Sequence, residues 1–346
     1  MSTEDAAAAI AAVYDDFGRR WARATSPLYE DWALGVAADA EVIGRIAALP
    51  RPKQQPNLVF AAARWEGCAE RPYADIRAWL RENWDRVRAT ALARTVQTNE
   101  ANRCATLLPA LSRIEGPVAL LEVGAAGGLC LFPDRYSVEY TTPAGVARVD
   151  PDAGPSTVVL ACRVDDPASV PTRYPRVAWR RGIDLDPIDA ADADAVDWLA
   201  NLVWPGPDHV ARVARLRAAA AIAAADPPLI VRGDLLQRLT EVAATAPADA
   251  TLVVFHSAVL LYLDASERRR FADLVAGLEG AVGRPVVWLS NETLGTLPEL
   301  DAQVPPGTAT DHRFVQTLNG RAVALAGQHG ALYETAPFGF DGSTGA

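Results

Sequence analysis

The chain has 346 residues, of which 50% are apolar and 22% charged, and its formal net charge is −10. This composition is that of a folded chain with one large domain, or of one α/β domain with a helical appendage. The negative charge argues against DNA or RNA as a partner, because phosphates would repel it. No apolar run reaches the about 18 residues that cross a membrane, and the N-terminus is acidic where a signal peptide is basic, so we expect a cytoplasmic protein.

The first part of the chain has a helical pattern without strand-like alternation, and we expect a helical N-terminal domain or lid at 1–115. Pro27 after Ser26 is typical of a helix start. Asn57 is a candidate N-cap for the helix that follows a loop. The expected helices cover 5–24, 28–49, 58–65, 73–83 and 86–111.

A polar cluster lies within the last of these expected helices. Its members are Gln97, Asn99, Glu100 and Arg103. At helical spacing, Glu100 is an i, i+3 neighbour of both Gln97 and Arg103. Two interpretations stay open: a solvated helix face with an ordinary ion pair, or a helix over a ligand site that supplies polar contacts.

The segment 118–131, VALLEVGAAGGLCL, combines an apolar run with a glycine-rich turn. The run predicts a buried parallel strand, and the turn has little side-chain bulk, so its backbone can approach a ligand. Glu122 argues against bound phosphates, because a carboxylate would repel them. It suits a ligand with hydroxyls and a positive centre, and S-adenosylmethionine is our working hypothesis.

Strands and helices alternate after this turn. We expect a small β insert at about 136–175, with a hairpin or antiparallel pairing over 136–165, and a closing hairpin over 314–325 around Asn319-Gly320. Acids follow two of the strands, Asp184 or Asp186 after one and Asp234 after another. The expected strands cover 176–189, 228–236, 251–256 and 285–289. The expected helices cover 190–202, 208–225, 235–244 and a segment opened by a capping box at 264–267.

This order predicts an α/β fold with a mostly parallel sheet and right-handed crossovers. One antiparallel strand near the C-terminus makes the arrangement that of a Rossmann-like class I methyltransferase domain, which we place at 116–340. Ligands of such sheets bind beyond the carboxyl ends of the strands, where Glu122, Asp184 and Asp234 are expected.

The motifs resemble those of DUF2332, a family of uncharacterised bacterial proteins that is itself similar to class I S-adenosylmethionine-dependent methyltransferases. The resemblance covers most of the chain. It rests on SPLY at 26–29, QTNE at 97–100, LLEVGAAGGL at 120–129, DRY at 134–136, RRGIDLDPID at 180–189, WP at 204–205 and RGD at 232–234.

The methyltransferase resemblance implies S-adenosylmethionine as cofactor and assigns residues to it. The acidic residue and the glycine positions of the cofactor motif correspond to Glu122, Gly124, Ala126 and Gly128. Asp184, or else Asp186, matches the acid that accepts the ribose hydroxyls, and Asp234 matches the acid near the adenine amino group. The turn departs from its relatives, which more often have Ser and Ala before the second glycine and Asn after the leucine. Here those positions are Ala126, Gly127 and Cys130.

His256 is the best candidate for a catalytic base, because its ordinary pKa lies near neutral pH; a hydrogen-bonded core histidine is the alternative. Glu292 and Glu100 are further candidates for a base or for binding a substrate amine, against purely structural roles. The candidate substrate contacts are Gln97, Asn99, Arg103, Tyr136 and Ser257, with Tyr136 equally typical of a packing residue.

The remaining residue types indicate little further chemistry. The four histidines, His209, His256, His312 and His329, lack metal-ligand spacing, and the four cysteines are expected to be buried thiols. We expect a small-molecule substrate, while a protein partner and the oligomeric state are left open. The alternative to a methyltransferase is the same fold turned to a cofactor-independent reaction, such as a substitution, cyclisation or elimination, or to a non-catalytic binding subunit.

Overall fold

The computed structural model describes residues 3–310 and 313–338, and these form two compact units of an α/β protein. Unit 1 comprises Met1–Thr98 with Ala193–Arg217, and unit 2 comprises Asn99–Asp192 with Ala218–Ala346. We expected a boundary near residue 115. The division falls after Thr98 because the next helix packs on the sheet of unit 2, where the Tyr140 hydroxyl donates to the Ala105 carbonyl at 2.7 Å. The expected domain end at 340 lies outside the described residues.

Unit 1 is helical, as the pattern predicts. Its elements are α1 (Thr3–Asp16), a π-helical segment (Phe17–Ala22), α2 (Pro27–Ala37), α3 (Ala40–Ala47), α4 (Pro56–Trp65), α5 (Tyr73–Glu82), α6 (Trp84–Ala93), α8 (Ala193–Leu202) and the first part of α9 (His209–Ala225). The predicted start at Pro27 is confirmed, with the Ser26 hydroxyl accepting from the Tyr29 amide. The prediction that Asn57 caps a helix is wrong, because Pro56 already occupies the first position of α4.

Buried aromatic residues form the centre of unit 1. The rings of Tyr29, Trp32 and Phe60 pack edge to face or stacked, with centroids 5.1–5.8 Å apart. Trp198 from α8 belongs to the same core, and its indole donates to the Thr95 carbonyl at 2.9 Å. Residues 193–217 therefore join unit 1 through packing, although they follow the sheet's second parallel strand in the sequence.

Unit 2 is built on one sheet of eleven strands, with the order β3-β2-β4-β11-β10-β9-β8-β7-β1-β5-β6. The strands are β1 (Pro117–Val123), β2 (Ser137–Thr142), β3 (Gly145–Val149), β4 (Val159–Val164), β5 (Arg176–Asp184), β6 (Leu229–Arg232), β7 (Thr251–Ser257), β8 (Val286–Thr293), β9 (Phe314–Leu318), β10 (Arg321–Ala326) and β11 (Leu332–Glu334). The helices are α7 (Cys104–Leu111), α10 (Leu235–Ala243), α11 (Ala265–Val282), the short α12 (Pro298–Asp301) and the rest of α9.

The sheet is mostly parallel, which confirms the coarser prediction. Strands β6, β5, β1, β7 and β8 all pair in parallel. Strand β9 then pairs antiparallel with β8, and β10 antiparallel with β9, through the predicted turn with positive φ at Asn319 and Gly320. The insert was expected to be antiparallel. Only β2 and β3 are, whereas β2 and β4 pair in parallel and β11 joins them to the main sheet.

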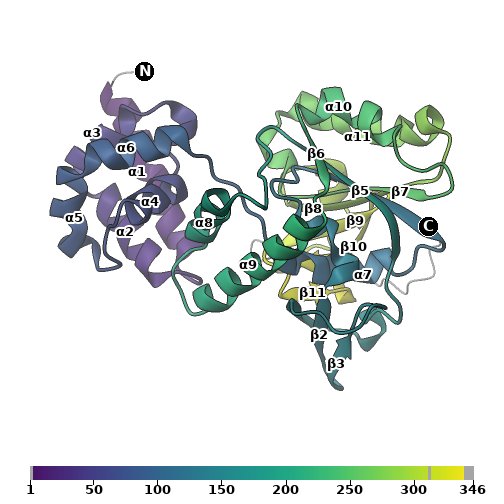
Figure 1. Cartoon of the computed structure of the whole chain (residues 1–346). Helices are drawn as coiled ribbons and strands as arrows, with labels where there is room; N and C mark the ends of the chain where they lie inside the picture. Colours follow the sequence, from purple (N-terminus) through teal and green to yellow (C-terminus); the bar gives the residue numbers. More distant parts are fainter. Residues whose placement is uncertain (1–2, 311–312, 339–346) are drawn as a thin grey trace. The chain divides into compact units, whose positions relative to one another are not determined.

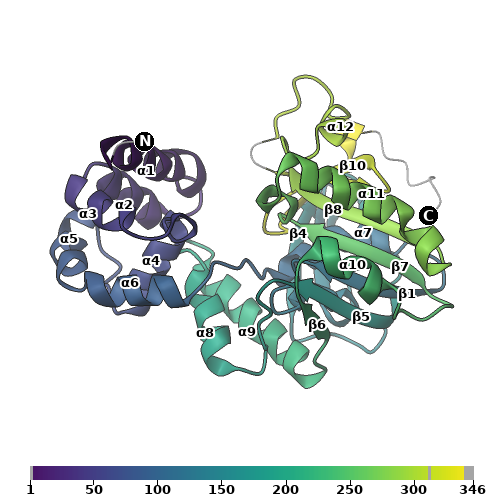
Figure 2. The same ribbon diagram turned by 90° about the horizontal axis from the view of Figure 1, so that it is seen from above.

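Helices α10 and α11 cover one face of the parallel strands (Figures 1 and 2). Their apolar residues pack with those of β1 and β7 in a single core that includes Leu121, Val254 and Phe271. Helix α11 begins with the predicted capping box of Asp264 and Glu267. Side chains that point to the opposite face of β1, Glu122 among them, are turned away from this core.

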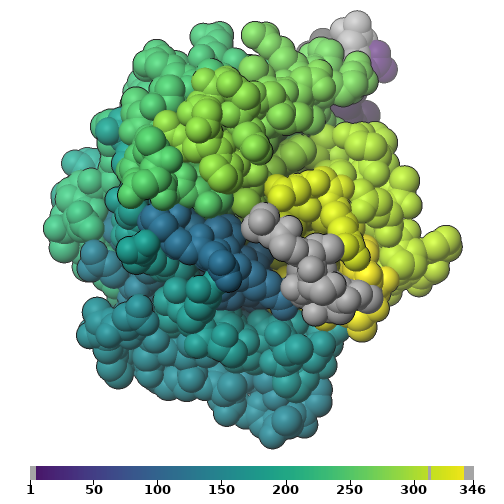
Figure 3. Space-filling view, turned by 90° about the vertical axis from the view of Figure 1, so that its right-hand side faces the viewer, coloured from purple at the N-terminus to yellow at the C-terminus, as the bar shows by residue number. Residues whose placement is uncertain are grey.

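The polar cluster at 97–100 is not helical, contrary to the prediction. Helix α6 ends at Ala93, residues 94–100 have no regular structure, and a 3₁₀ turn (Ala101–Arg103) leads into α7. The expected i, i+3 pairs therefore do not exist as helix neighbours. In Figure 3 the blue segment that precedes β1 reaches the surface between the green region of α10 and α11 and the teal region of β2 and β3.

Within the described ranges, no helix is both long enough and apolar enough to cross a membrane. The four cysteines are free and buried, as predicted.

Candidate functional site

The glycine turn after β1 has a backbone that few side chains tolerate. Gly124, Ala126 and Gly128 all have positive φ, at 71°, 49° and 70°. A Cβ at position 124 would lie 2.4 Å from a Cγ of Val259, so this position requires glycine for space as well as for conformation. Ala126 is a non-glycine residue in the left-handed region, and such strain is typical of functional sites.

Most backbone amides of the turn are bound within the protein. The amides of Gly124 and Ala125 donate to the Ile183 carbonyl at 2.8 and 3.2 Å, and the Gly128 amide donates to the Ala125 carbonyl at 2.7 Å. Except for Gly124, residues 122–130 are buried. The turn therefore offers a ligand an exposed backbone at Gly124 rather than a row of unbound amides.

Three residues predicted to contact cofactor or substrate form hydrogen bonds with the turn itself. The Asp184 carboxylate accepts from the Ala126 amide at 2.8 Å and from the amide of Asp186 at 2.8 Å. Asn99 donates to the Ala125 carbonyl and accepts from the Leu129 amide, both at 3.2 Å.

The third is Tyr136, whose hydroxyl donates to the Leu129 carbonyl at 2.7 Å from a fully buried position. These residues fix the shape of the turn. Sequence spacing alone does not distinguish this role from that of binding a ligand.

Glu122 is the exception, because its carboxylate is buried without being satisfied. The residue is 8% exposed, and its Oε2 atom has no hydrogen-bond partner among the residues that the structure describes. Burial, together with the nearby Cys130 and Asp184, raises the pKa of Glu122 well above its ordinary value, and the Arg103 guanidinium only partly opposes this. A buried acceptor without a partner costs free energy, so it marks a place where a ligand can supply the missing donor.

His256 is a core histidine and not an available base. Its side chain is fully buried, and the Trp288 indole donates to its Nε2 at 3.0 Å. Because an indole can only donate, Nε2 is the unprotonated nitrogen, and Nδ1 carries the proton that goes to Glu292 Oε1 at 2.7 Å. Both ring nitrogens are thus engaged.

Glu292 lies within β8 rather than after it, and its Oε1 also accepts from the amides of Val259 and Leu260. It holds the turn after β7 in place. Its Oε2 is, besides that of Glu122, the second buried carboxylate oxygen without a partner in the described part of the chain.

Two further predicted residues act as caps of short turns or helices. Glu100 is buried, and its Oε1 accepts from the Asn102 amide at 3.2 Å, at the start of the 3₁₀ turn before α7. Asp234 caps α10, with Oδ1 accepting from the Leu236 amide at 2.8 Å. Gln97 is half-buried and belongs to unit 1, so it is not among the residues that unit 2 brings together.

Sequence reasoning missed Asn291 on β8 and Gln316 in the middle of β9, which form a polar chain with the predicted Ser257. Gln316 donates to the Thr106 carbonyl at 2.8 Å and to Asn291 Oδ1 at 3.1 Å, and Asn291 donates to the Ser257 hydroxyl at 3.3 Å. Arg103 donates to the Ser257 carbonyl at 3.2 Å. Amide side chains at buried positions of otherwise apolar strands are the signal that could have found this chain.

Within residues 3–310 and 313–338, no three His, Cys, Asp or Glu side chains gather in a way that could hold a metal ion. His312 lies outside the described residues.

The family model described as "Uncharacterized protein conserved in bacteria (DUF2332)" matches residues 11–334 of the chain. No curated protein and no solved structure gives a significant match. Because this match spans nearly the whole sequence, the chain belongs to the DUF2332 family.

Proposed function

We propose that this protein binds S-adenosylmethionine at the carboxyl ends of β1 and β5 and transfers its methyl group to a small molecule. The observation that carries the proposal is Glu122, a buried carboxylate whose Oε2 lacks a partner in the described chain, two residues before the exposed backbone of Gly124. A cationic donor satisfies such an oxygen, and S-adenosylmethionine has both a sulfonium and an ammonium group.

The strand order supports the same location. Taken along the chain, the five parallel strands β1, β5, β6, β7 and β8 have the spatial order 3-2-1-4-5. This is the order of doubly wound nucleotide-binding sheets, in which ligands bind where the order reverses, next to the first strand. Glu122, the last residue but one of β1, and Ser257, the last residue of β7, lie on the two strands that flank this point.

The other residues fit the cofactor in part. Asp184 uses its carboxylate for two amides, but a carboxylate has about four acceptor sites, so it can also accept from ribose hydroxyls. Asp234 would lie near the adenine amino group and already caps α10 through one oxygen. When bound, the cofactor supplies an electrophilic methyl group, and the protein contributes alignment and exclusion of water. His256 is engaged on both nitrogens, so the proposed transfer requires an acceptor that needs no base from this residue.

A second candidate function has its own support. Because the turn amides are bound internally and Val259 packs against Gly124, the same fold could serve a cofactor-independent reaction or a binding subunit. Ala126 and Cys130, where relatives have more polar residues, point the same way.

Calorimetry with S-adenosylmethionine and S-adenosylhomocysteine separates the two candidates. We expect micromolar binding to the wild-type protein and a loss of about tenfold or more in Glu122→Gln, since a charge-assisted hydrogen bond is removed. Glu241→Gln is the matched control, because Glu241 is 61% exposed and paired with Arg238 on α10. Asp184→Ala is a poorer test, as it also removes the support of the turn.

Proton release sharpens this experiment. Because burial raises the pKa of Glu122, a cation that binds there opposes this shift and favours release of the carboxyl proton. The binding enthalpy should therefore depend on the ionisation enthalpy of the buffer in wild type and much less in Glu122→Gln. Absence of binding by both compounds would refute the proposed function and favour the second candidate.

A further inference from the structure

Arg103 and Glu122 are buried side chains at the same edge of the sheet, one a cation and the other an acid. They are 7% and 8% exposed. Glu122 on β1 is in register with Phe255 on β7, and Ser257 lies two residues, roughly 6.6 Å, further toward the carboxyl edge and on the same face. The Ser257 carbonyl accepts from Arg103 Nη1. The guanidinium therefore lies at the end of the strand next to Glu122.

The Arg103 guanidinium is held by two hydrogen bonds and an aromatic contact, and it keeps N–H donors for a ligand. Its Nε donates to the Gln328 carbonyl at 2.9 Å, and its Cζ lies 5.4 Å from the centre of the Phe314 ring. Two of its five N–H donors go to backbone carbonyls. In the part of the chain that the structure describes, its carboxylate partner is missing. No ion pair joins it to Glu122, although its charge lowers the pKa of that residue against the effect of burial.

We propose that Arg103 and Glu122 together bind the zwitterionic head of an α-amino acid, with the ligand carboxylate at Arg103 and its ammonium at Glu122. A group with both charges satisfies the Glu122 Oε2 atom and uses the planar N–H fork of Arg103, which suits carboxylates. The exposed backbone at Gly124 is the point of approach. The inference deepens the proposed function, because such a head belongs either to the amino-acid tail of S-adenosylmethionine or to an amino-acid substrate.

A pair of ligands tests the role of the carboxylate without changing the protein. S-adenosylmethionine and its decarboxylated form share the sulfonium and the ammonium, and differ only in the carboxylate. We expect the decarboxylated form to bind wild-type protein about tenfold or more weakly by calorimetry, because it loses a charge-assisted hydrogen bond. Equal affinities would overturn the assignment of Arg103 while leaving the proposed function intact.

Variants of Arg103 complete the cycle. In Arg103→Met the two ligands should bind about equally, and in Arg103→Lys an intermediate preference should remain, because the charge is kept and the fork is lost. Arg163→Met, an exposed position on β4, is the matched control and should keep the wild-type preference. If Arg103→Met does not fold, Arg103→Lys and the ligand pair carry the test. A preference unchanged in Arg103→Lys would count against the inference.

The two sources of the zwitterion are distinguished by a second arm. If S-adenosylmethionine does not bind, the proposed function fails, and the twenty common L-amino acids are then screened at millimolar concentration by thermal shift. Binding of an amino acid that Arg103→Lys weakens would support the inference on its own. No binding in either arm would overturn it.

Discussion

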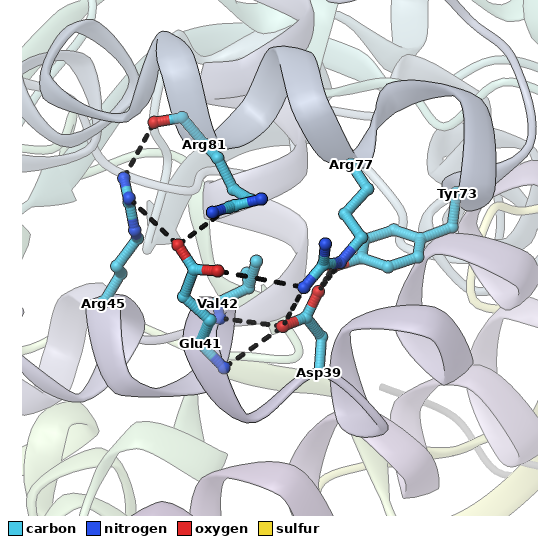
Figure 4. A network of polar contacts seen from close by, with 7 residues as sticks. All are labelled: Asp39, Glu41, Val42, Arg45, Tyr73, Arg77 and Arg81. Atoms are coloured by element: carbon cyan, nitrogen blue, oxygen red, sulfur yellow. Dashed lines mark hydrogen bonds and ion pairs between the residues drawn. The ribbon is translucent and has the colours of Figure 1, made fainter.

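Asp39 in unit 1 and Glu122 in unit 2 are both buried carboxylates, each 8% exposed. They differ in their hydrogen-bond partners and in the direction of their pKa shifts. Asp39 is surrounded by donors (Figure 4): its oxygens accept from Arg77 Nε at 2.5 Å, from the Tyr73 hydroxyl at 2.9 Å and from the amides of Glu41 and Val42. Although burial opposes ionisation, the bonds from Arg77, Tyr73 and Val42 outweigh it and lower the pKa of Asp39 to about 2. Glu122 has a raised pKa and an oxygen without a partner in the described chain.

This difference is the one expected between a structural acid and an acid that binds a ligand, which is the role we propose for Glu122. Asp39 borders an open cleft of about 380 Å³ that Tyr73 and Arg77 also line, which makes it the more conspicuous site by shape. Its hydrogen bonds are nevertheless complete within the protein, and it serves as the N-cap of α3. Glu122 does not border this cleft, and its hydrogen bonds within the described chain are incomplete. We therefore base the proposal of a ligand at Glu122 on its unfilled hydrogen-bonding capacity and its place at the carboxyl end of β1, and not on the presence of a cleft.

The largest expected effect on stability is that of Asp39→Ala. It should lower the free energy of unfolding by about 3 kcal/mol, because it removes an N-cap and charge-assisted hydrogen bonds at once. Urea unfolding followed by tryptophan fluorescence measures this, since most of the tryptophans belong to unit 1. Asp39→Asn keeps the cap and should cost about half as much. A change below about 0.5 kcal/mol in Asp39→Ala would remove the contrast with Glu122.

In its hydrogen bonds Glu292 is intermediate between Asp39 and Glu122. One of its oxygens accepts three hydrogen bonds, and the other accepts none from the described residues. We expect Glu292→Gln to lower the free energy of unfolding by about 2 kcal/mol. The amide oxygen can still accept the three bonds, but the NH2 group replaces Oε2 and buries N–H donors that have no partner there. The exposed Glu299→Gln is the control in the same urea titration. Unchanged stability with lost ligand binding would instead place Glu292 with Glu122 as a functional acid.

Much of the fold follows from the sequence, because apolar periodicity and turn chemistry are local. The strands β1, β7 and β8, the capping box at Asp264 and the turn at Asn319 are all visible as patterns. The segment 94–100 was misjudged, since it has few apolar residues and no helix breaker. The parallel pairing of β2 with β4 could not be predicted, because strand pairing depends on distant partners that periodicity does not reveal.

The candidate site was predictable in position but not in the roles of its residues. Glu122 and Asp184 were expected at strand ends, where the structure has them. That Asp184 supports the turn while Glu122 remains unsatisfied depends on which backbone amides lie within hydrogen-bond distance. The same limit applies to His256, whose partners Trp288 and Glu292 both come from a neighbouring strand.

A smaller effect is expected at Asp234, which tests whether an acid at a strand end is only a cap. Asp234→Ala should lower the free energy of unfolding by about 1 kcal/mol through loss of the α10 cap, whereas Asp234→Ser retains the cap and should cost less. Urea titration measures the stability, and calorimetry measures the affinity for S-adenosylhomocysteine. If Asp234 contacts adenine, Asp234→Ser weakens that affinity despite its intact cap; equal affinity would restrict Asp234 to a structural role.

Near pH 4 the smallest change in the free energy of unfolding is expected for Glu122→Gln. At higher pH this variant should be more stable than the wild type, whereas the other variants are less stable. Below the unfolded-state pKa of about 4.3 the wild type and Glu122→Gln differ little, because Glu122 is protonated in both states. As the pH rises, the unfolded carboxyl ionises first, because burial raises the pKa of the folded one. Between these two pKa values the wild type loses stability relative to Glu122→Gln by up to about 1.4 kcal/mol for each pH unit. Asp39 behaves in the reverse way. Because its pKa is lowered, the stability advantage of the wild type over Asp39→Asn decreases as the pH falls from about 4 to 2.

Urea titrations of the three proteins from pH 3 to 8 measure both effects. The difference in the free energy of unfolding between wild type and each variant should change in opposite pH ranges. A flat curve for Glu122→Gln would mean that this carboxyl is ionised and paired in the folded protein, and the basis for placing a cationic ligand there would be lost.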